Sequence, residues 1–107
     1  MRQISPRQLA DWLADRSRAA PVLIDVRETW EFALCRIEGS RLLPMQSVPG
    51  NLDTLETDAE IVVVCHHGMR SQQVASFLEG RGFTSLFNLS GGVHAWATEV
   101  DPAMPTY

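Results

Sequence analysis

The feature that most restricts how this chain can fold is the apolar run Ile61-Val62-Val63-Val64-Cys65. Its β-branched residues favour a strand. A half-exposed strand alternates apolar and polar residues, but this run is apolar throughout. Such a strand fits the centre of a parallel sheet that is covered on both faces. The run therefore predicts an α/β fold with Cys65 at the carboxyl end of a central strand.

The rest of the chain alternates between helical and strand-like segments. Ser5-Pro6-Arg7-Gln8 has the pattern of a capped helix start, and Gly80 and Gly82 mark a helix end. This alternation predicts parallel strands joined by right-handed crossovers, with ligands bound beyond the carboxyl ends of the strands. We expect strands at 22–26, 41–44, 61–65 and 85–89, and helices at 6–16, 29–34, 48–55, 71–80 and 93–99.

Length and charge narrow the function classes. The 107 residues suggest a single domain, 1–107, and the net charge of -4 argues against a nucleic-acid partner. No apolar run approaches the about 20 residues of a membrane span, and the first residues lack the apolar core of a secretory signal. Cys35 and Cys65 form neither a disulfide framework nor a CxxC pair. We therefore expect a cytoplasmic protein with no membrane partner.

The segment Cys65-His66-His67-Gly68-Met69-Arg70-Ser71 joins the central strand to a helix and carries the candidate chemistry. A short loop that closes onto a helix start can turn its N–H groups inward and bind an anion. Gly68 suits the tight curve, and a helix N-terminus favours the nucleophilic thiolate. Cys65 could then hold an extra sulfur as a persulfide, with Arg70 binding an anionic donor. The alternative is that Cys65 is a small core residue.

These residues resemble the rhodanese family, specifically its single-domain members. The resemblance runs from about Ile4 to Tyr107, and its motifs are Leu23-Ile24-Asp25-Val26-Arg27-Glu28 with Glu31-Phe32, Ile37-Glu38-Gly39-Ser40, the loop 65–71, Asn88-Leu89-Ser90-Gly91-Gly92 with Ala95-Trp96, and the ending Val100-Asp101-Pro102 with Pro105 and Tyr107. Cys35-Arg36 and Ser40 depart from the pattern that is common in this family, but they lie outside the loop.

The resemblance implies a five-stranded parallel sheet with helices on both faces, and a thiosulfate:cyanide sulfurtransferase activity. It implies that Cys65 is the catalytic residue that carries sulfur as a persulfide, and we expect the activity to need no cofactor. It implies a small anionic sulfur donor and a thiophilic acceptor such as cyanide or a thiol. By position in the loop, the candidate substrate-binding residues are His66, His67, Gly68, Met69, Arg70 and Ser71.

Loop length separates this activity from that of related phosphatases and arsenate reductases. Those enzymes place one residue more between the cysteine and the arginine than the four that separate Cys65 from Arg70. The tighter ring suits a single sulfur atom better than a phosphate group. Two other functions remain open: a relay module that partner proteins load and unload, and a binding domain without catalysis. The presence of Cys65 argues against a binding domain without catalysis.

Several further residues invite a functional role that packing could also explain. Adjacent histidines rarely converge on one ion and no fourth ligand is evident, so we expect His66 and His67 to bind no metal. Asp25 is either a catalytic base or, as we prefer, a hydrogen-bonded brace beneath the loop. Arg27 is expected to form a local ion pair with Glu28 or Glu31, which would contribute under ~1 kcal/mol if exposed.

We expect the remaining candidate residues to have structural rather than functional roles. We expect Cys35 to pack or lie at the surface rather than resolve a persulfide, and His94 to lie on a helix surface. We expect the three tryptophans to pack in the core or at the rim of the site, with Trp30 the nearest to the site: Trp12, Trp30 and Trp96.

Overall fold

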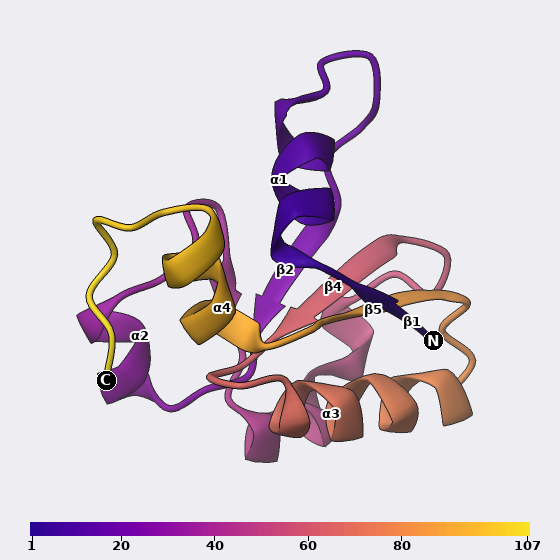
Figure 1. The fold of residues 1–107 in the computed structure, drawn as a ribbon. Helices are drawn as coiled ribbons and strands as arrows, with labels where there is room; N and C mark the ends of the chain where they lie inside the picture. The colour runs from indigo at the N-terminus through magenta and orange to yellow at the C-terminus, as the bar shows by residue number, and fades with distance from the viewer.

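The computed structural model describes residues 1–107 and contains one sheet of five parallel strands. The strand order is β1-β5-β4-β2-β3, which puts β4 in the middle (Figure 1). The expected α/β fold is confirmed. The strands are β1 Arg2–Ile4, β2 Val22–Asp25, β3 Arg41–Leu42, β4 Glu60–Val64 and β5 Ser85–Leu89.

Helices cover both faces of the sheet (Figure 1). The side chains of β4 divide between the two faces, since alternate residues of a strand point in opposite directions. Ile61 and Val63 pack with α3, whereas Val62 and Val64 pack with α1 and α4. The helices are α1 Pro6–Ala14, α2 Thr29–Leu34, α3 Met69–Gly80 and α4 Gly92–Glu99, with 3-10 turns η1 Met45–Ser47 and η2 Pro49–Thr54. None of them is long and apolar enough to cross a lipid bilayer.

The start of α1 forms as its sequence predicts. The Ser5 hydroxyl accepts the Gln8 N–H at 3.1 Å, and the Gln8 side chain accepts the Ser5 N–H at 2.9 Å. These reciprocal bonds satisfy two N–H groups that have no partner within the helix. The helix ends at Ala14, slightly before the expected end near residue 16.

Three expectations need correction. The first strand, β1, was missed because it has only three residues and its Arg2 and Gln3 are exposed at the sheet edge. Segment 48–55 forms 3-10 turns instead of an α-helix, because Gly50 and Asn51 are poor helix formers and Asn51 takes non-helical angles. Helix α3 begins at Met69, directly after Gly68, instead of at residue 71.

The N-terminus of α4 lies against the loop that follows β4. The Val93 N–H donates to the Cys65 carbonyl at 2.9 Å, and the His94 N–H donates to the His66 carbonyl at 3.1 Å. Gly92 allows this approach: a Cβ there would lie 2.3 Å from the Cys65 carbonyl oxygen and 2.4 Å from that of His66. Gly92 also has a φ of +60°, which disfavours any larger residue.

We predict that Gly92→Ala lowers the free energy of unfolding by at least about 2 kcal/mol, because the new methyl group meets backbone atoms that cannot move freely. Urea unfolding followed by circular dichroism measures the change. Gly80→Ala is the matched control, since a Cβ at this last residue of α3 meets nothing within 4 Å. A Gly92→Ala protein as stable as the Gly80→Ala protein would contradict the predicted clash.

Candidate functional site

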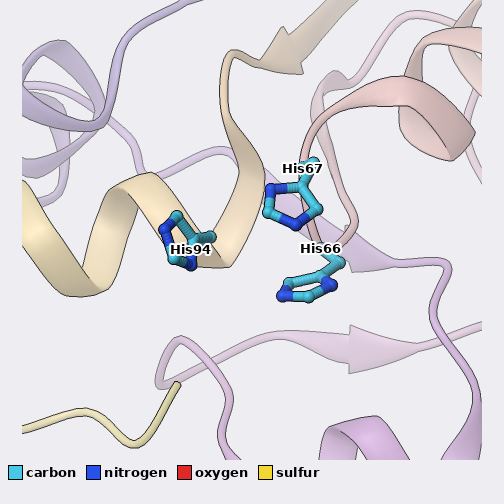
Figure 2. Close-up of side chains that lie close together, drawn as sticks. All are labelled: His66, His67 and His94. Atoms are coloured by element: carbon cyan, nitrogen blue, oxygen red, sulfur yellow. The ribbon is translucent and has the colours of Figure 1, made fainter. Parts of the chain in front are cut away.

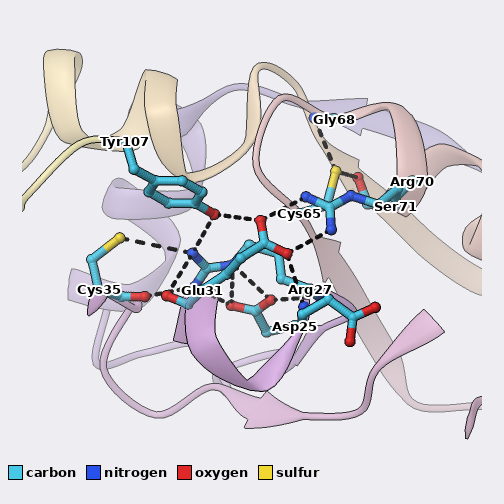
Figure 3. A network of polar contacts seen from close by, with 10 residues as sticks. Asp25, Arg27, Glu31, Cys35, Cys65, Gly68, Arg70, Ser71 and Tyr107 are labelled. Atoms are coloured by element: carbon cyan, nitrogen blue, oxygen red, sulfur yellow. Dashed lines mark hydrogen bonds and ion pairs between the residues drawn. The ribbon is translucent and has the colours of Figure 1, made fainter. Parts of the chain in front are cut away.

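The sulfur of Cys65 lies just beyond the carboxyl end of β4, at the centre of the loop that leads to α3 (Figure 3). Cys65 is 1% exposed. Its Sγ accepts the Gly68 N–H at 3.1 Å and lies 3.2 Å from the Ser71 hydroxyl. The buried sulfur therefore has polar partners from the middle of the loop and from the first turn of α3, which a plain core cysteine does not need.

Gly68 gives the loop its curvature. Its φ of +99° belongs to the left-handed region that glycine adopts most easily, and α3 begins at the next residue. The free N–H groups and the dipole of the helix place positive potential at its N-terminus. The loop thus carries the sulfur next to the positive end of a 12-residue helix.

Asn88 on β5 holds the loop from the side. Its amide nitrogen donates to the Gly68 carbonyl at 3.1 Å and to the Gln3 side-chain oxygen at 2.9 Å. The Ser71 hydroxyl donates to the Asn88 amide oxygen. Because this bond uses the only hydroxyl hydrogen of Ser71, the Cys65 thiol donates to the Ser71 oxygen. Forming the thiolate would require the Ser71 hydroxyl to turn from Asn88 towards the sulfur.

Arg70 forms a two-pronged ion pair with Glu31 of α2. Its two terminal nitrogens lie 2.7 and 2.9 Å from the two carboxylate oxygens of Glu31. The Glu31 side chain is 4% exposed and that of Arg70 is 35% exposed. The bond from Arg70 lowers the pKa of Glu31 to about 2, and the same pairing raises the pKa of Arg70. Arg70 is therefore held in place and still reaches solvent.

Tyr107 and Arg27 extend this network (Figure 3). The Tyr107 hydroxyl donates to Glu31 at 2.7 Å and accepts from Arg27 at 2.9 Å. Burial raises the pKa of Tyr107 to about 12, so the phenol stays protonated at neutral pH. The network therefore joins the end of the chain to the ion pair beside the loop.

Arg27 is fully buried and pairs with Asp25, not with a neighbouring glutamate. Its Nη2 lies 2.7 Å from Asp25 Oδ2, and both side chains are 0% exposed. The same nitrogen donates to the Cys35 carbonyl at 2.6 Å. The expected ion pair with Glu28 or Glu31 is not formed, because the buried carboxylate of Asp25 needs a cation beside it. Asp25 is hydrogen-bonded, as the sequence favoured, but all of its side-chain bonds are to Arg27 and none is to the loop.

The histidines and Met69 line the outer side of the loop. His66 is half-buried and stacks on the Tyr107 ring, with the ring centroids 3.9 Å apart. Burial, followed by the charge of His67, lowers the pKa of His66, so its imidazole is neutral at pH 7. His67 is exposed, and Met69 is 77% exposed. These side chains form the border between the buried sulfur and solvent.

The structure also places the residues that the sequence assigned to packing. Cys35 is buried, and its sulfur lies 3.7 Å from the Arg27 guanidinium. Trp12 and Trp96 are buried, as expected, whereas Trp30 is exposed and packs edge-on against Tyr107. His94 lies on the exposed surface of α4, as expected.

Three contacts in the network were missed by sequence reasoning. Glu31 was assigned to Arg27 although it pairs with Arg70, and Asn88 and Tyr107 received no role of their own. Asn88 stands among the apolar residues Leu86, Phe87 and Leu89 of β5, and this polar residue inside an apolar run was the available signal. Nothing in the local pattern connects Tyr107 with Glu31, because 76 positions separate them.

We predict that the Glu31–Arg70 pair makes stability fall in acid. Because the pKa of Glu31 is lowered from 4.5 to about 2, its contribution is complete above pH 4.5 and is lost as the pH falls towards 2. Allowing for the partial exposure of Arg70, we expect a loss of about 1–2 kcal/mol between pH 7 and pH 3. Glu31→Gln should therefore lower the free energy of unfolding more at pH 7 than at pH 3, with this amount as the difference.

Denaturant titrations of both proteins at the two pH values measure this difference. Glu38→Gln is the control, since Glu38 is an exposed glutamate. An equal destabilisation by Glu31→Gln at pH 7 and pH 3 would show that the carboxylate charge contributes nothing.

Comparison with known proteins places these features in a family. The model of the rhodanese-like domain matches residues 7–99. The chain is 38% identical over 95 residues to "Thiosulfate sulfurtransferase GlpE" of Ectopseudomonas mendocina, covering 89% of this chain and 84% of that protein. It is 35% identical over 106 residues to "Probable adenylyltransferase/sulfurtransferase MoeZ" of Mycobacterium tuberculosis, covering 97% of this chain.

Some relatives are much longer, and the chain spans 26% to 30% of the length of these proteins. Among solved structures, a rhodanese-like domain protein from Staphylococcus aureus superposes with a TM-score of 0.84 at 30% identity, covering 100% of this chain and 99% of that one. The family match at residues 7–99 contains strands β2 to β5 and helices α2 to α4, but neither β1 nor Tyr107. This chain belongs to the rhodanese-like domain family.

Proposed function

We propose that this protein is a sulfurtransferase of the thiosulfate type and that Cys65 carries the transferred sulfur as a persulfide. The observation that carries the proposal is the Gly68 N–H directed at the Cys65 sulfur from the start of α3. The similarity to a thiosulfate sulfurtransferase over most of both chains supports the reaction class.

In the first half-reaction, the Cys65 thiolate attacks the outer sulfur of thiosulfate. A new S–S bond forms to Cys65, the S–S bond of thiosulfate breaks, and sulfite leaves with its electron pair. In the second half-reaction, cyanide or a thiolate attacks the outer sulfur and the Cys65 thiolate leaves. No external oxidant or reductant is needed, because the sulfane sulfur moves between two nucleophiles. Cys65 must enter this cycle as a free thiol, which a reducing compartment such as the cytoplasm maintains.

The loop backbone supports an extra sulfur atom next to Cys65. The carbonyls of Cys65 and His66 both point to α4, where they accept the N–H groups of Val93 and His94 in its first turn. In a trans peptide the N–H points opposite to the carbonyl, so the N–H groups of His66 and His67 face away from α4. Together with the Gly68 N–H, they can donate to the negatively charged outer sulfur of the persulfide.

The side chains at the border of the loop determine what can reach the sulfur. Because Cys65 is 1% exposed, a sulfur donor reaches it only after part of the surrounding loop moves, and the exposed His67 and Met69 side chains belong to that loop. Arg70 is the cation beside this entrance, and its partial exposure leaves it able to bind an anionic sulfonate or sulfate-like group. We therefore assign donor binding to Arg70 and persulfide stabilisation to the loop amides.

The persulfide can be detected directly by intact-mass spectrometry. We predict that excess thiosulfate adds one sulfur, roughly 32 Da, to the wild-type protein, and that cyanide removes it. Cys65→Ala should gain no sulfur and should have no transferase activity. Cys35→Ala is the matched control and should load like the wild type, since Cys35 lies in a different core cluster. Sulfur loading on Cys35 with Cys65 unmodified would contradict the assignment.

Steady-state kinetics test the role of Arg70. We predict that Arg70→Ala raises the KM for thiosulfate at least about tenfold, with a smaller effect on kcat, because the lost contact is to the donor. Arg70→Lys should recover part of the loss by restoring the charge. Arg16→Ala removes an exposed arginine from another part of the chain and should change neither constant. An unchanged KM in Arg70→Ala would exclude donor binding by this residue.

A sulfur-relay role is the second candidate, in which partner proteins supply and accept the sulfur. The exposed apolar side chains of Met69 and Trp30 favour it, since they offer a contact surface on the loop and beside Tyr107. The similarity to a much longer adenylyltransferase/sulfurtransferase also supports it. A very high KM for thiosulfate together with rapid loading by a cysteine desulfurase would identify a relay.

A further inference from the structure

All three histidines of the chain meet at one place on the surface (Figure 2). His66 and His67 come from the loop after β4, and His94 comes from the first turns of α4. One side-chain nitrogen from each lies within 4.8 Å of the others. The sequence argument against a metal was that adjacent histidines rarely converge and that no fourth ligand was evident. The fold adds His94, which lies 27 positions away from His67.

We propose that His66, His67 and His94 together bind one divalent cation of the borderline class, such as Zn²⁺, Ni²⁺ or Cu²⁺. Imidazole nitrogen is a preferred ligand of these ions, whereas Mg²⁺ and Ca²⁺ prefer oxygen. A three-histidine set leaves at least one coordination position for water or another ligand.

A buried nitrogen without a partner supports the proposal independently. His66 Nε2 is shielded from solvent and has no hydrogen-bond partner. Leaving a buried polar atom unpaired costs free energy, and such atoms are rare in folded proteins. In the proposed site this nitrogen is the His66 ligand, so that a bound metal ion supplies its missing interaction.

The backbone holds the three residues in position for a common ion. The His94 N–H bonds to the His66 carbonyl at 3.1 Å, so the loop and α4 are directly connected. The His66 ring is stacked on Tyr107, whereas the His67 and His94 side chains are exposed and have room to turn. One ligand is therefore nearly fixed and two can adjust.

The adjustment that a metal requires is small. Imidazole nitrogens lie about 2.0–2.1 Å from a zinc ion, which places two of them about 3.3 Å apart in a tetrahedral site. The present nitrogens lie within 4.8 Å of one another. Rotation of the two exposed side chains can close a gap of this size without moving the backbone.

Isothermal titration with Zn²⁺ tests the site. We expect one equivalent to bind to the wild-type protein and to raise its thermal midpoint, because an ion that bridges the loop and α4 binds the folded state only. His94→Gln should weaken binding at least tenfold and remove the thermal shift. His67→Gln, a second exposed variant, should do the same. Thr98→Ala changes an exposed residue one turn further along α4 and should bind like the wild type.

Cys65→Ala separates the proposed site from the thiol, which is itself a possible ligand. The proposal expects this variant to keep one equivalent of Zn²⁺, because the three imidazoles remain. Binding that is lost in Cys65→Ala but retained in His94→Gln would place the ion on the sulfur and overturn the proposal. Absence of binding to the wild-type protein would overturn it as well.

Discussion

The geometry of the site depends on the contact between α4 and the loop that follows β4. Two N–H groups in the first turn of α4 donate to the carbonyls of Cys65 and His66, and only a glycine at position 92 allows that approach. Once these carbonyls are fixed, the directions of the next peptide N–H groups are fixed as well. The loop can then surround a sulfur atom without any side chain having to hold it.

The charges beside the loop are balanced in pairs. Asp25 neutralises Arg27 in the core, and Glu31 neutralises Arg70 at the edge of the loop. The chain as a whole carries a net charge of -4. The protein as a whole therefore does not attract a doubly negative sulfur donor such as thiosulfate. The proposed binding of that anion must come from hydrogen-bond donors and positive charge close to the loop. The loop N–H groups, the start of α3 and the exposed part of Arg70 are the donors available for this.

Local sequence patterns predicted the parts of the fold that have strong local causes. The apolar run 61–65 predicts strand β4 through its composition, and the Ser5 cap predicts the start of helix α1 through its side-chain hydrogen bonds. Both elements form in the structure. The edge strand β1 lacks such a signal, because its polar residues become a strand only by pairing with β5. The 3-10 turns at 45–54 similarly depend on packing that short-range propensity does not describe.

In the candidate site, too, the residues of one continuous segment could be predicted from the sequence, whereas those brought in by the fold could not. Cys65, Gly68 and Arg70 occupy one continuous segment, so their spacing was informative. Their partners Glu31 and Asn88 come from other elements, and only the folded topology brings them to the loop. The histidine cluster was missed for the same reason, since the position of His94 follows from the packing of α4 on the loop.

The central claim is that this loop holds one additional sulfur atom on Cys65. A crystal structure of thiosulfate-treated protein tests it most directly. The account predicts one extra atom about 2.05 Å from the Cys65 Sγ, lying inside the loop and facing its N–H groups. An unmodified Cys65 in the soaked crystal, or an extra sulfur that points away from the loop amides, would contradict it.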